Sequence, residues 1–210
     1  MILEASKSAF FSEQQLDTIA DKITDQGYLV LKDAVDNELL EGLLLQAKCL
    51  SADHWREAGI GRKEHHQIDR SIRSDKIHWI NGAVQAENQF LELMESLRLG
   101  LNRRLYLGLY DYESHYAKYA NGMFYKKHLD ALKGKSNRVL SSVLYLNANW
   151  LEEYSGELLI HDPHNDVILA SVSPQLGTMV LFLSEKFPHQ VLPAKRERFS
   201  IAGWFRVNNS

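Results

Sequence analysis

The chain has 210 residues, 45% of them hydrophobic and 24% charged, so it can bury a core of ordinary size without disulfides. Lys and Arg number 24 against 27 Asp and Glu, and a formal net charge of -3 argues against the basic surface typical of nucleic-acid or anionic-membrane binding. Cys49 is the only cysteine, and no apolar run reaches the length of a membrane span. We therefore expect a cytoplasmic protein of one domain, residues 1–210, with no nucleic-acid or membrane partner.

The first predicted elements are two helices joined by a short strand. Ser12 and Gln15 form a capping-box pattern, and apolar residues follow at helical spacing until Gly27 ends the helix. Residues 28–31 are predicted to form a strand, and Asp36 is a suitable N-cap for the second helix. The apolar face of that helix consists of Leu39, Leu40, Leu43, Leu44 and Ala47.

Residues 58–76 separate the second helix from the third and show no sustained helical or strand period. They are rich in charge and glycine. Segments of this kind are often lids or binding loops, but a solvated excursion without a function fits the composition equally well. The sequence leaves both interpretations open.

The third helix has the clearest periodicity in the chain. Its apolar stripe consists of Phe90, Leu93, Met94, Leu97, Leu101 and Leu105. At this spacing, packing against a sheet explains the stripe better than a cofactor role does. Residues 1–105 are thus predicted to be mostly helical support for the rest of the chain.

From residue 114 onward the segments become short and alternating, as is typical of strands. The predicted strands are residues 115–119, 124–129, 139–146, 157–161, 178–183 and 199–205. Gly, Asn, Asp, Pro and Ser gather in the turns between them. The pattern predicts an α+β fold in which the N-terminal helices pack on a β barrel or sandwich spanning residues 106–206.

Three residues in the strand region are candidates for holding a metal ion. His128 and Asp130 are two apart at the end of a predicted strand, so their side chains point to one face and can converge on one ion. His189 follows the apolar strand at 178–183 and is the candidate third ligand. Two imidazoles and one carboxylate form the facial triad that suits nonheme Fe(II) and leaves positions open for substrate and oxygen.

Other features of the sequence weigh on this assignment. In a chain with nine histidines, a solvent-facing strand end explains an isolated His-x-Asp pair better than a metal site does. His161 and His164 flank Asp-Pro and fit a polar loop, while the adjacent His65 and His66 would not face one ion on a strand. The assignment therefore depends on the residues that follow His189.

The C-terminal segment strengthens the metal assignment. One face of its predicted strand carries Arg198, Ser200, Ala202 and Trp204. If His189 binds metal, Arg198 is placed to bind the far carboxylate of a dicarboxylate cosubstrate through two parallel hydrogen bonds. The alternative for Arg198 is a surface salt bridge with Glu197 or Glu185. The hydroxyl of Ser200 on the same strand face favours the cosubstrate.

Four blocks of sequence follow one another in this region. They are AKYANGMFYKKHLD at 117–130, RVLSSVLYLN at 138–147, GELLI at 156–160 and HQVLPAKRERFSIAGWF at 189–205. In order and spacing they resemble the catalytic domain of the prolyl hydroxylases, in the branch that contains the oxygen-sensing prolyl hydroxylases and their bacterial counterparts. The upstream segment IRSDKIHW at 72–79 resembles the part of that branch that closes a mobile substrate loop.

The resemblance implies a double-stranded β-helix, a fold of the jelly-roll or cupin type, with iron on His128, Asp130 and His189. The residues implied to bind or line the 2-oxoglutarate site are Arg198, Tyr145, Tyr119 and Ser200. Some relatives carry a threonine four residues after the arginine, where this chain has Ala202. The hydroxyl of Ser200 could take the place of that threonine.

The resemblance also implies how a substrate is held. The residues implied to contact it are Arg138, Trp204, Arg73 and Asp75. Residues 58–76 would be the loop that folds over a protein substrate.

The implied reaction is Fe(II)- and 2-oxoglutarate-dependent hydroxylation of a prolyl residue by O2, with succinate and CO2 as coproducts and ascorbate as a candidate reductant. Some bacterial members of the branch act on the translation machinery, so a translation factor is a candidate partner. No side chain beyond the metal ligands is assigned a catalytic role. The alternatives are the same chemistry on a free amino acid or other small molecule, and a β-helix module that senses or binds without catalysis.

Overall fold

The computed structural model describes residues 10–59, 69, 71–131 and 136–208. Its helices are α1 (Glu13–Asp25), α2 (Asn37–Cys49) and α3 (Gln85–Leu105), with 3-10 turns at Ala52–His54 and Glu152–Tyr154. Its strands are β1 (Tyr28–Leu31), β2 (Arg56–Glu57), β3 (Lys76–Trp79), β4 (Leu109–Tyr119), β5 (Tyr125–His128), β6 (Arg138–Tyr145), β7 (Leu158–His161), β8 (Ile168–Val172), β9 (Met179–Leu183), β10 (His189–Val191) and β11 (Arg198–Val207). None of the helices described is both long and apolar enough to cross a membrane.

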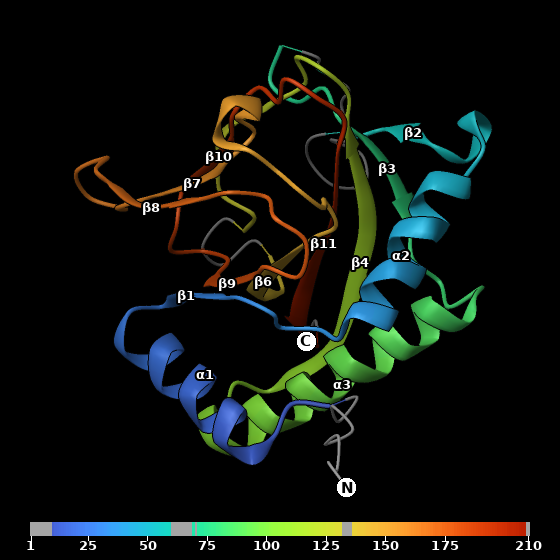
Figure 1. Cartoon of the computed structure of the whole chain (residues 1–210). Helices are drawn as coiled ribbons and strands as arrows, with labels where there is room; N and C mark the ends of the chain where they lie inside the picture. Colours follow the sequence, from blue (N-terminus) through green and yellow to red (C-terminus); the bar gives the residue numbers. More distant parts are fainter. Residues whose placement is uncertain (1–9, 60–68, 70, 132–135, 209–210) are drawn as a thin grey trace, which may run out of the picture.

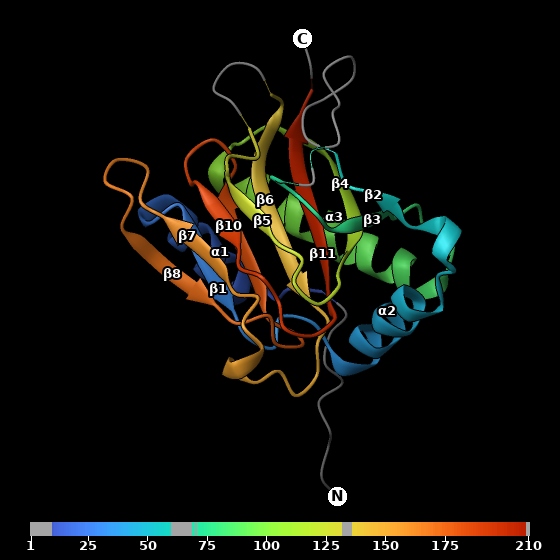
Figure 2. The ribbon, with the colours of Figure 1, turned by 90° about the horizontal axis from the view of Figure 1, so that it is seen from above.

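Two antiparallel sheets form the centre of the fold (Figures 1 and 2). The larger sheet has the strand order β1-β9-β6-β11-β4-β3-β2, and the smaller sheet has the order β5-β10-β7-β8. Strands that are distant in the chain are therefore neighbours, so β11 lies between β4 and β6, and β10 lies between β5 and β7. This arrangement is the double-stranded β-helix that the sequence resemblance implied, and that prediction is confirmed.

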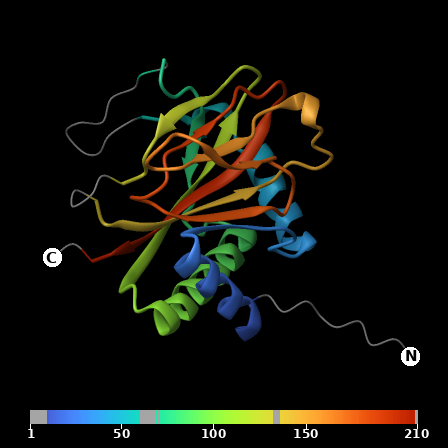
Figure 3. The ribbon, with the colours of Figure 1, turned by 90° about the vertical axis from the view of Figure 1, so that its left-hand side faces the viewer.

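The helices pack on the outer face of the larger sheet. The Ser12 hydroxyl accepts from the backbone of Gln15, whose side chain accepts in return, and the Asp36 side chain accepts from the backbone of Leu39. These caps satisfy N–H groups that a helix leaves without partners at its first turn. Figure 3 shows α1 and α3 lying together beneath the sheets. The predicted starts of both N-terminal helices are confirmed.

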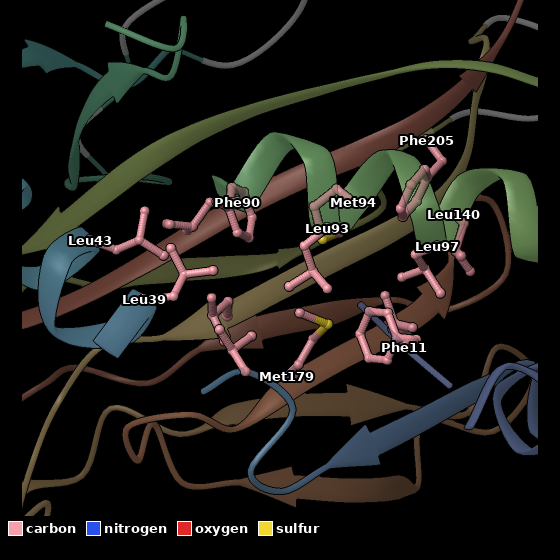
Figure 4. Packing of buried hydrophobic residues seen from close by; sticks show 14 of the residues in the cluster. Phe11, Leu39, Leu43, Phe90, Leu93, Met94, Leu97, Leu140, Met179 and Phe205 are labelled. Atoms are coloured by element: carbon pink, nitrogen blue, oxygen red, sulfur yellow. The ribbon is translucent and has the colours of Figure 1, made fainter. Parts of the chain in front are cut away.

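The main apolar core lies between α3 and the larger sheet. Five residues of the predicted stripe on α3 are buried, namely Phe90, Leu93, Met94, Leu97 and Leu101. In Figure 4 the α3 side chains face Leu140, Met179 and Phe205, with Leu39 and Leu43 of α2 at one end of the cluster. Packing against a sheet, as the spacing predicted, is therefore the role of this stripe.

A second apolar cluster fills the space between the two sheets. It consists of Ala117, Tyr119, Tyr145, Leu158, Ile160, Val172, Val180, Phe182, Phe187 and Val191. Because the larger sheet is covered on both faces, most residues of its inner strands β6 and β9 are buried. The side chains between the sheets form the floor of the site described below.

The N-terminal half contributes more to the larger sheet than the sequence predicted. Residues 1–105 were expected to be mostly helical, but β2 and β3 also lie there, and β3 pairs with β4. β4 begins at Leu109 rather than residue 115, and the sequence did not predict β8 or β10. β2, β3, β8 and β10 have five residues or fewer, so each contains too few alternating apolar and polar positions for the sequence pattern to reveal it. Within the predicted loop at 58–76, residues 60–68 and 70 lie outside the described residues.

Two leucines on α3 test how much the core contributes to stability. Leu97 is fully buried, whereas Leu99 on the same helix is 45% exposed. We expect Leu97→Ala to lower the free energy of unfolding by about 2–5 kcal/mol, because it removes buried methyl groups and leaves a cavity. Leu99→Ala should change it by less than about 0.5 kcal/mol. Urea unfolding followed by circular dichroism measures both, and equal losses in the two variants would contradict this packing.

Candidate functional site

The three candidate metal ligands meet where β5 and β10 pair. His128 ends β5, His189 begins β10, and the two residues are partners in the antiparallel ladder, with ring centroids 4.2 Å apart. Oδ1 of Asp130 lies 3.5 Å from Nε2 of His128 and 3.7 Å from Nε2 of His189. One ligand atom from each residue lies within 4.8 Å of the other two. The structure thus brings together the three residues that the sequence indicated.

The backbone orients both imidazole rings. Nδ1 of His128 lies 2.8 Å from the carbonyl oxygen of Lys126, and Nδ1 of His189 lies 3.0 Å from that of Phe187. A carbonyl only accepts, so each Nδ1 carries a proton and each Nε2 keeps a lone pair in the neutral ring. Burial lowers the pKa of His189 to about 4, which keeps this ring neutral at physiological pH. Two imidazole lone pairs beside a carboxylate oxygen form a donor set that fits a transition-metal ion.

The carboxylate of Asp130 is ionised although its side chain is only 10% exposed. Burial by itself would raise the pKa of Asp130, but the positive charge that the imidazoles of His189 and His128 carry when protonated, together with the hydroxyl of Ser141, holds it well below its usual range. Ser141 Oγ donates to Oδ2 of Asp130 at 2.7 Å. Sequence reasoning did not find Ser141, because its contact with Asp130 depends on β6 lying beside the end of β5.

A second group of side chains surrounds Arg198, the first residue of β11. In the ladder, Arg198 is the partner of Tyr119 on β4, and Ser200 is the partner of Tyr145 on β6. The guanidinium therefore lies between two phenol rings, 4.8 Å from the centroid of Tyr119 and 5.0 Å from that of Tyr145. It donates from Nη1 to Ser200 Oγ at 3.3 Å. All four residues that the sequence associated with the cosubstrate lie together.

Arg198 is buried, with 1% of its surface exposed. The alternative of a surface salt bridge is therefore wrong, and Glu197 instead pairs with Lys118 at 2.9 Å. Within the described residues, no carboxylate pairs with Arg198, and its Nε and the hydroxyl of Tyr145 have no hydrogen-bond partner. Burial also raises the pKa of Tyr145 to about 12, so this phenol remains a donor. A buried cation surrounded by donors is suited to an anionic ligand.

One cavity of about 670 Å³ connects the two groups. Its lining includes His128, Asp130, His189, Tyr119, Arg198 and Ser200, together with apolar Leu158 and Val191. An anion bound at Arg198 and a metal ion held by the three candidate ligands would thus lie in the same cavity. This fits a small dicarboxylate that spans from the arginine to a metal.

Of the four residues implied to contact substrate, three line the cavity and one does not. Arg138, Trp204 and Arg73 line the cavity, and the guanidinium of Arg138 lies 3.5 Å from the ring centroid of Trp204 while also bonding Glu113. Asp75 is 1% exposed and is not part of the cavity lining. Its two carboxylate oxygens accept from Nε and Nη2 of Arg73 at 2.7 and 2.9 Å. The structure therefore directs Asp75 at Arg73 rather than at the cavity.

Two further residues of the cavity wall were not singled out from the sequence. Tyr125 stacks on His128, with ring centroids 3.5 Å apart and planes 12° apart, and the guanidinium of Arg73 lies 4.6 Å from the centroid of the Tyr125 ring. His115 precedes Ala117 and Tyr119 by two and four residues on β4 and shares their face. Alternation along the predicted strand could have indicated His115, but nothing in the sequence indicated the stacking of Tyr125.

His115 is a buried imidazole between two indoles. Its ring centroid lies 5.2 Å from that of Trp79 and 5.4 Å from that of Trp204, and its Nδ1 lies 3.1 Å from the carbonyl oxygen of Tyr116. Burial, with a smaller effect from the positive charge of Arg73, lowers the pKa of His115 to about 3. The neutral ring is therefore the form that the folded protein contains.

This burial predicts a pH dependence of stability. Between the ordinary pKa of 6.5 and the folded value of about 3, the unfolded chain binds a proton at His115 that the folded chain does not, so stability falls as pH falls. His115 alone should remove about 2 kcal/mol between pH 7 and pH 5. His115→Asn should reduce this slope without abolishing it, because the lowered pKa of His189 acts in the same direction over this pH range. Urea unfolding at both pH values measures it, and an unchanged slope in the variant would contradict the assignment.

Comparisons with known proteins bear on the same region. The model of the 2OG-Fe(II) oxygenase superfamily matches residues 114–206. Prolyl hydroxylase EGLN3 of Mus musculus is 31% identical over 143 residues, which cover 65% of this chain and 59% of that protein. The hypoxia-inducible factor prolyl hydroxylase of Caenorhabditis elegans is 26% identical over 181 residues, covering 78% and 22%. The chain thus spans less than two thirds of the length of these curated relatives.

Solved structures extend the likeness to nearly the whole chain. A prolyl-4-hydroxylase of Pseudomonas putida superposes with a TM-score of 0.83 at 35% identity, covering 92% of this chain and 100% of that one. A Trichoplax adhaerens prolyl hydroxylase, in complex with a peptide fragment of the hypoxia inducible factor oxygen degradation domain, has a TM-score of 0.81 at 22% identity and covers 92% and 90%. The second likeness supports the fold alone. Because the first joins the same fold to substantial identity over an entire relative, this chain belongs to the prolyl hydroxylase branch of the 2OG-Fe(II) oxygenase superfamily.

Proposed function

We propose that this protein hydroxylates a prolyl residue of a protein substrate, using Fe(II), 2-oxoglutarate and O2 and forming succinate and CO2. The observation that carries the proposal is Arg198, a buried cation with no carboxylate partner in the described part of the chain. It lies in the cavity that also contains the His128, Asp130 and His189 cluster. Burying an unpaired charge is costly, so the cavity is suited to an anion that reaches from Arg198 to a metal.

His128, Asp130 and His189 are the proposed ligands of Fe(II). An ion held by these three residues alone would keep positions for the cosubstrate and for oxygen. When bound, the iron, together with 2-oxoglutarate and O2, supplies the oxidative chemistry that inserts an oxygen atom into an unactivated C–H bond. The chain orients the ligands, keeps Asp130 ionised and His189 neutral, and lines part of the cavity with apolar side chains. No side chain is required as a general base.

Arg198 is the proposed partner of the far carboxylate of 2-oxoglutarate. Its guanidinium can meet a carboxylate with two parallel hydrogen bonds, and the hydroxyl of Tyr145 can add a third donor. Ser200 keeps the guanidinium in place, while Tyr119 forms the opposite wall of the pocket. Ala202 offers no hydroxyl here, which leaves Ser200 as the hydroxyl beside the arginine.

The substrate side of the cavity has a rigid wall and an exposed lip. Trp204 and Arg138 stack on one another, and Arg73 is held by Asp75, so their positions are set before a substrate binds. Trp79, at the lip, is 48% exposed although it is a large aromatic residue. We infer that the lip receives a peptide chain and that Asp75 positions Arg73 rather than touching the substrate. Residues 58–76 remain the proposed substrate loop, most of which lies outside the described residues.

Among protein substrates, a translation factor is the first candidate that we propose, as the resemblance to the bacterial members of the branch implies. Such a substrate would place the reaction in the cytoplasm, which agrees with a chain that has one cysteine. The complete donor set and the buried Arg198 favour catalysis over a module that only binds. No feature of the cavity favours a free amino acid over a peptide.

Arg198 gives a direct test of cosubstrate binding. Arg198→Ala should raise the KM for 2-oxoglutarate by about 30-fold or more, since removing one partner of a buried charge pair costs about 2 kcal/mol at least. Arg198→Lys should recover part of the loss, because it keeps the charge without the two-pronged geometry. The control is Arg196→Ala, at an exposed arginine two residues away. Succinate formation at varied 2-oxoglutarate measures all three, and an unchanged KM in Arg198→Ala would refute the assignment.

The proposed reaction is tested with purified protein, Fe(II), 2-oxoglutarate, ascorbate and cell extract. Succinate should rise and mass spectrometry should find one added oxygen on a prolyl peptide. Asp130→Ala should abolish both, whereas Asp166→Ala, which removes an exposed carboxylate, should abolish neither. Activity that survives in Asp130→Ala would overturn the ligand assignment. Oxygen found only on small metabolites would overturn the peptide substrate, and modified peptides that never come from a translation factor would overturn that partner.

A further inference from the structure

We propose that Ser141 is a positioning residue, which turns the Asp130 carboxylate so that Oδ1 faces the metal while Oδ2 is held away from it. Ser184 supports Ser141 in this role. The inference rests on the proposed function, since it takes Asp130 as a metal ligand. To the proposed metal site it adds two buried hydroxyls, that of Ser141 on β6 and that of Ser184 just after β9, which determine the orientation of the Asp130 carboxylate.

The side chain of Asp130 needs a hydrogen bond from another side chain to orient it, whereas the backbone orients the imidazoles of His128 and His189. His128 and His189 lie in paired strands, and backbone carbonyls accept from their Nδ1 atoms. Asp130 lies beyond the end of β5, where no strand ladder sets the direction of its side chain. Ser141 is the described residue whose hydrogen bond fixes this carboxylate from the side opposite the imidazoles.

The contact between Ser141 and the Asp130 carboxylate fixes the direction of each hydrogen bond in the chain of hydroxyls. Ser141 Oγ lies 2.7 Å from Asp130 Oδ2 and 2.8 Å from Ser184 Oγ. A carboxylate oxygen accepts, so the single proton of Ser141 is donated to Oδ2 of Asp130. The oxygen of Ser141 then accepts from the hydroxyl of Ser184. The direction runs from Ser184 to Ser141 to Asp130, and each donor strengthens the next.

The backbone holds this chain of hydroxyls in place. Ser184 N–H donates to the carbonyl of Val139 on β6, and the carbonyl of Ser184 accepts from the N–H of Ala131 at 3.3 Å. Ser184 is thus tied both to the strand that carries Ser141 and to the residue after Asp130. Ser141 and Ser184 are 1% and 0% exposed, so water does not replace either hydroxyl in the folded protein.

The consequence is a carboxylate with one oxygen available. Oδ2 accepts from Ser141, while Oδ1 lies 3.5 Å and 3.7 Å from the Nε2 atoms of the two histidines. A carboxylate held in this way contributes one ligand atom instead of two. Groups that orient a ligand in this manner commonly change metal affinity or activity by about 10- to 100-fold when they are removed.

Anaerobic titration with Fe(II), without substrate, tests this role. Ser141→Ala should weaken Fe(II) binding by about 10- to 100-fold. Ser184→Ala should weaken it less, because Ser141 still donates to Asp130. Ser141→Thr retains a hydroxyl and should bind within a few-fold of wild type. With metal and 2-oxoglutarate both saturating, the visible charge-transfer absorption should shift in Ser141→Ala, because a carboxylate that can turn changes the donor set around the iron.

The matched control is Ser142→Ala. Ser142 is the neighbouring buried serine; it borders the cavity, but its hydroxyl bonds the hydroxyl of Tyr112 at 2.9 Å and not Asp130. This variant should lose stability without losing Fe(II) affinity. Circular dichroism and the melting temperature establish that each variant is folded. The order of loss, with Ser141→Ala greatest, Ser184→Ala intermediate and Ser142→Ala absent, is what the hydrogen-bond chain requires.

Three results would overturn the role of Ser141. They are Fe(II) affinity within twofold of wild type in folded Ser141→Ala, a wild-type absorption spectrum in that variant at saturation, and an equal loss in Ser142→Ala. If wild-type protein itself failed to bind Fe(II), the proposed function would fall instead. The two failures are therefore distinguishable in one series of titrations.

Discussion

The pairing of β11 with β4 on one side and β6 on the other is the constraint on which the proposed cosubstrate end of the site depends. This register places Arg198 opposite Tyr119 and Ser200 opposite Tyr145, so the guanidinium is enclosed by phenols that come from two other strands. Side chains alternate along β11, so Trp204 lies on the same face as Arg198 and walls the substrate side. A slip of one residue would turn all of these side chains toward the helices.

The smaller sheet supplies the metal end by the same means. β10 pairs with β5, which brings His189 opposite His128, and the two sheets pack on a shared apolar cluster that keeps both ends of the cavity in register. Electrostatics complements this framework. At one end a buried arginine has no described carboxylate partner, and at the other end three acceptor atoms converge. Each end alone is costly to bury, and a chelating dicarboxylate with a metal would satisfy both.

Rigidity is distributed unevenly around the site. The imidazoles and the arginine belong to strands, so the ladder and the core behind it hold them. Asp130 lies just beyond the end of β5, and its carboxylate relies on a side-chain hydrogen bond from Ser141 on β6. Arg73 likewise depends on buried Asp75, which lies too deep to line the cavity. Ser141 and Asp75 do not line the cavity themselves, but each orients a side chain that does. This explains why a charged residue such as Asp75 is buried behind the cavity wall.

The sequence alone determined the features that neighbours along the chain control. Caps at Ser12 and Asp36, the stripe on α3, the His-x-Asp spacing and the shared face of Arg198 and Ser200 all follow from local geometry. The resemblance added the fold and the family. Only the tertiary structure decided that Ser141 donates to Asp130 and that His115 lies between Trp79 and Trp204. Those contacts join strands far apart in the chain, and their register is set by the packing of the whole sheet, which no local pattern encodes.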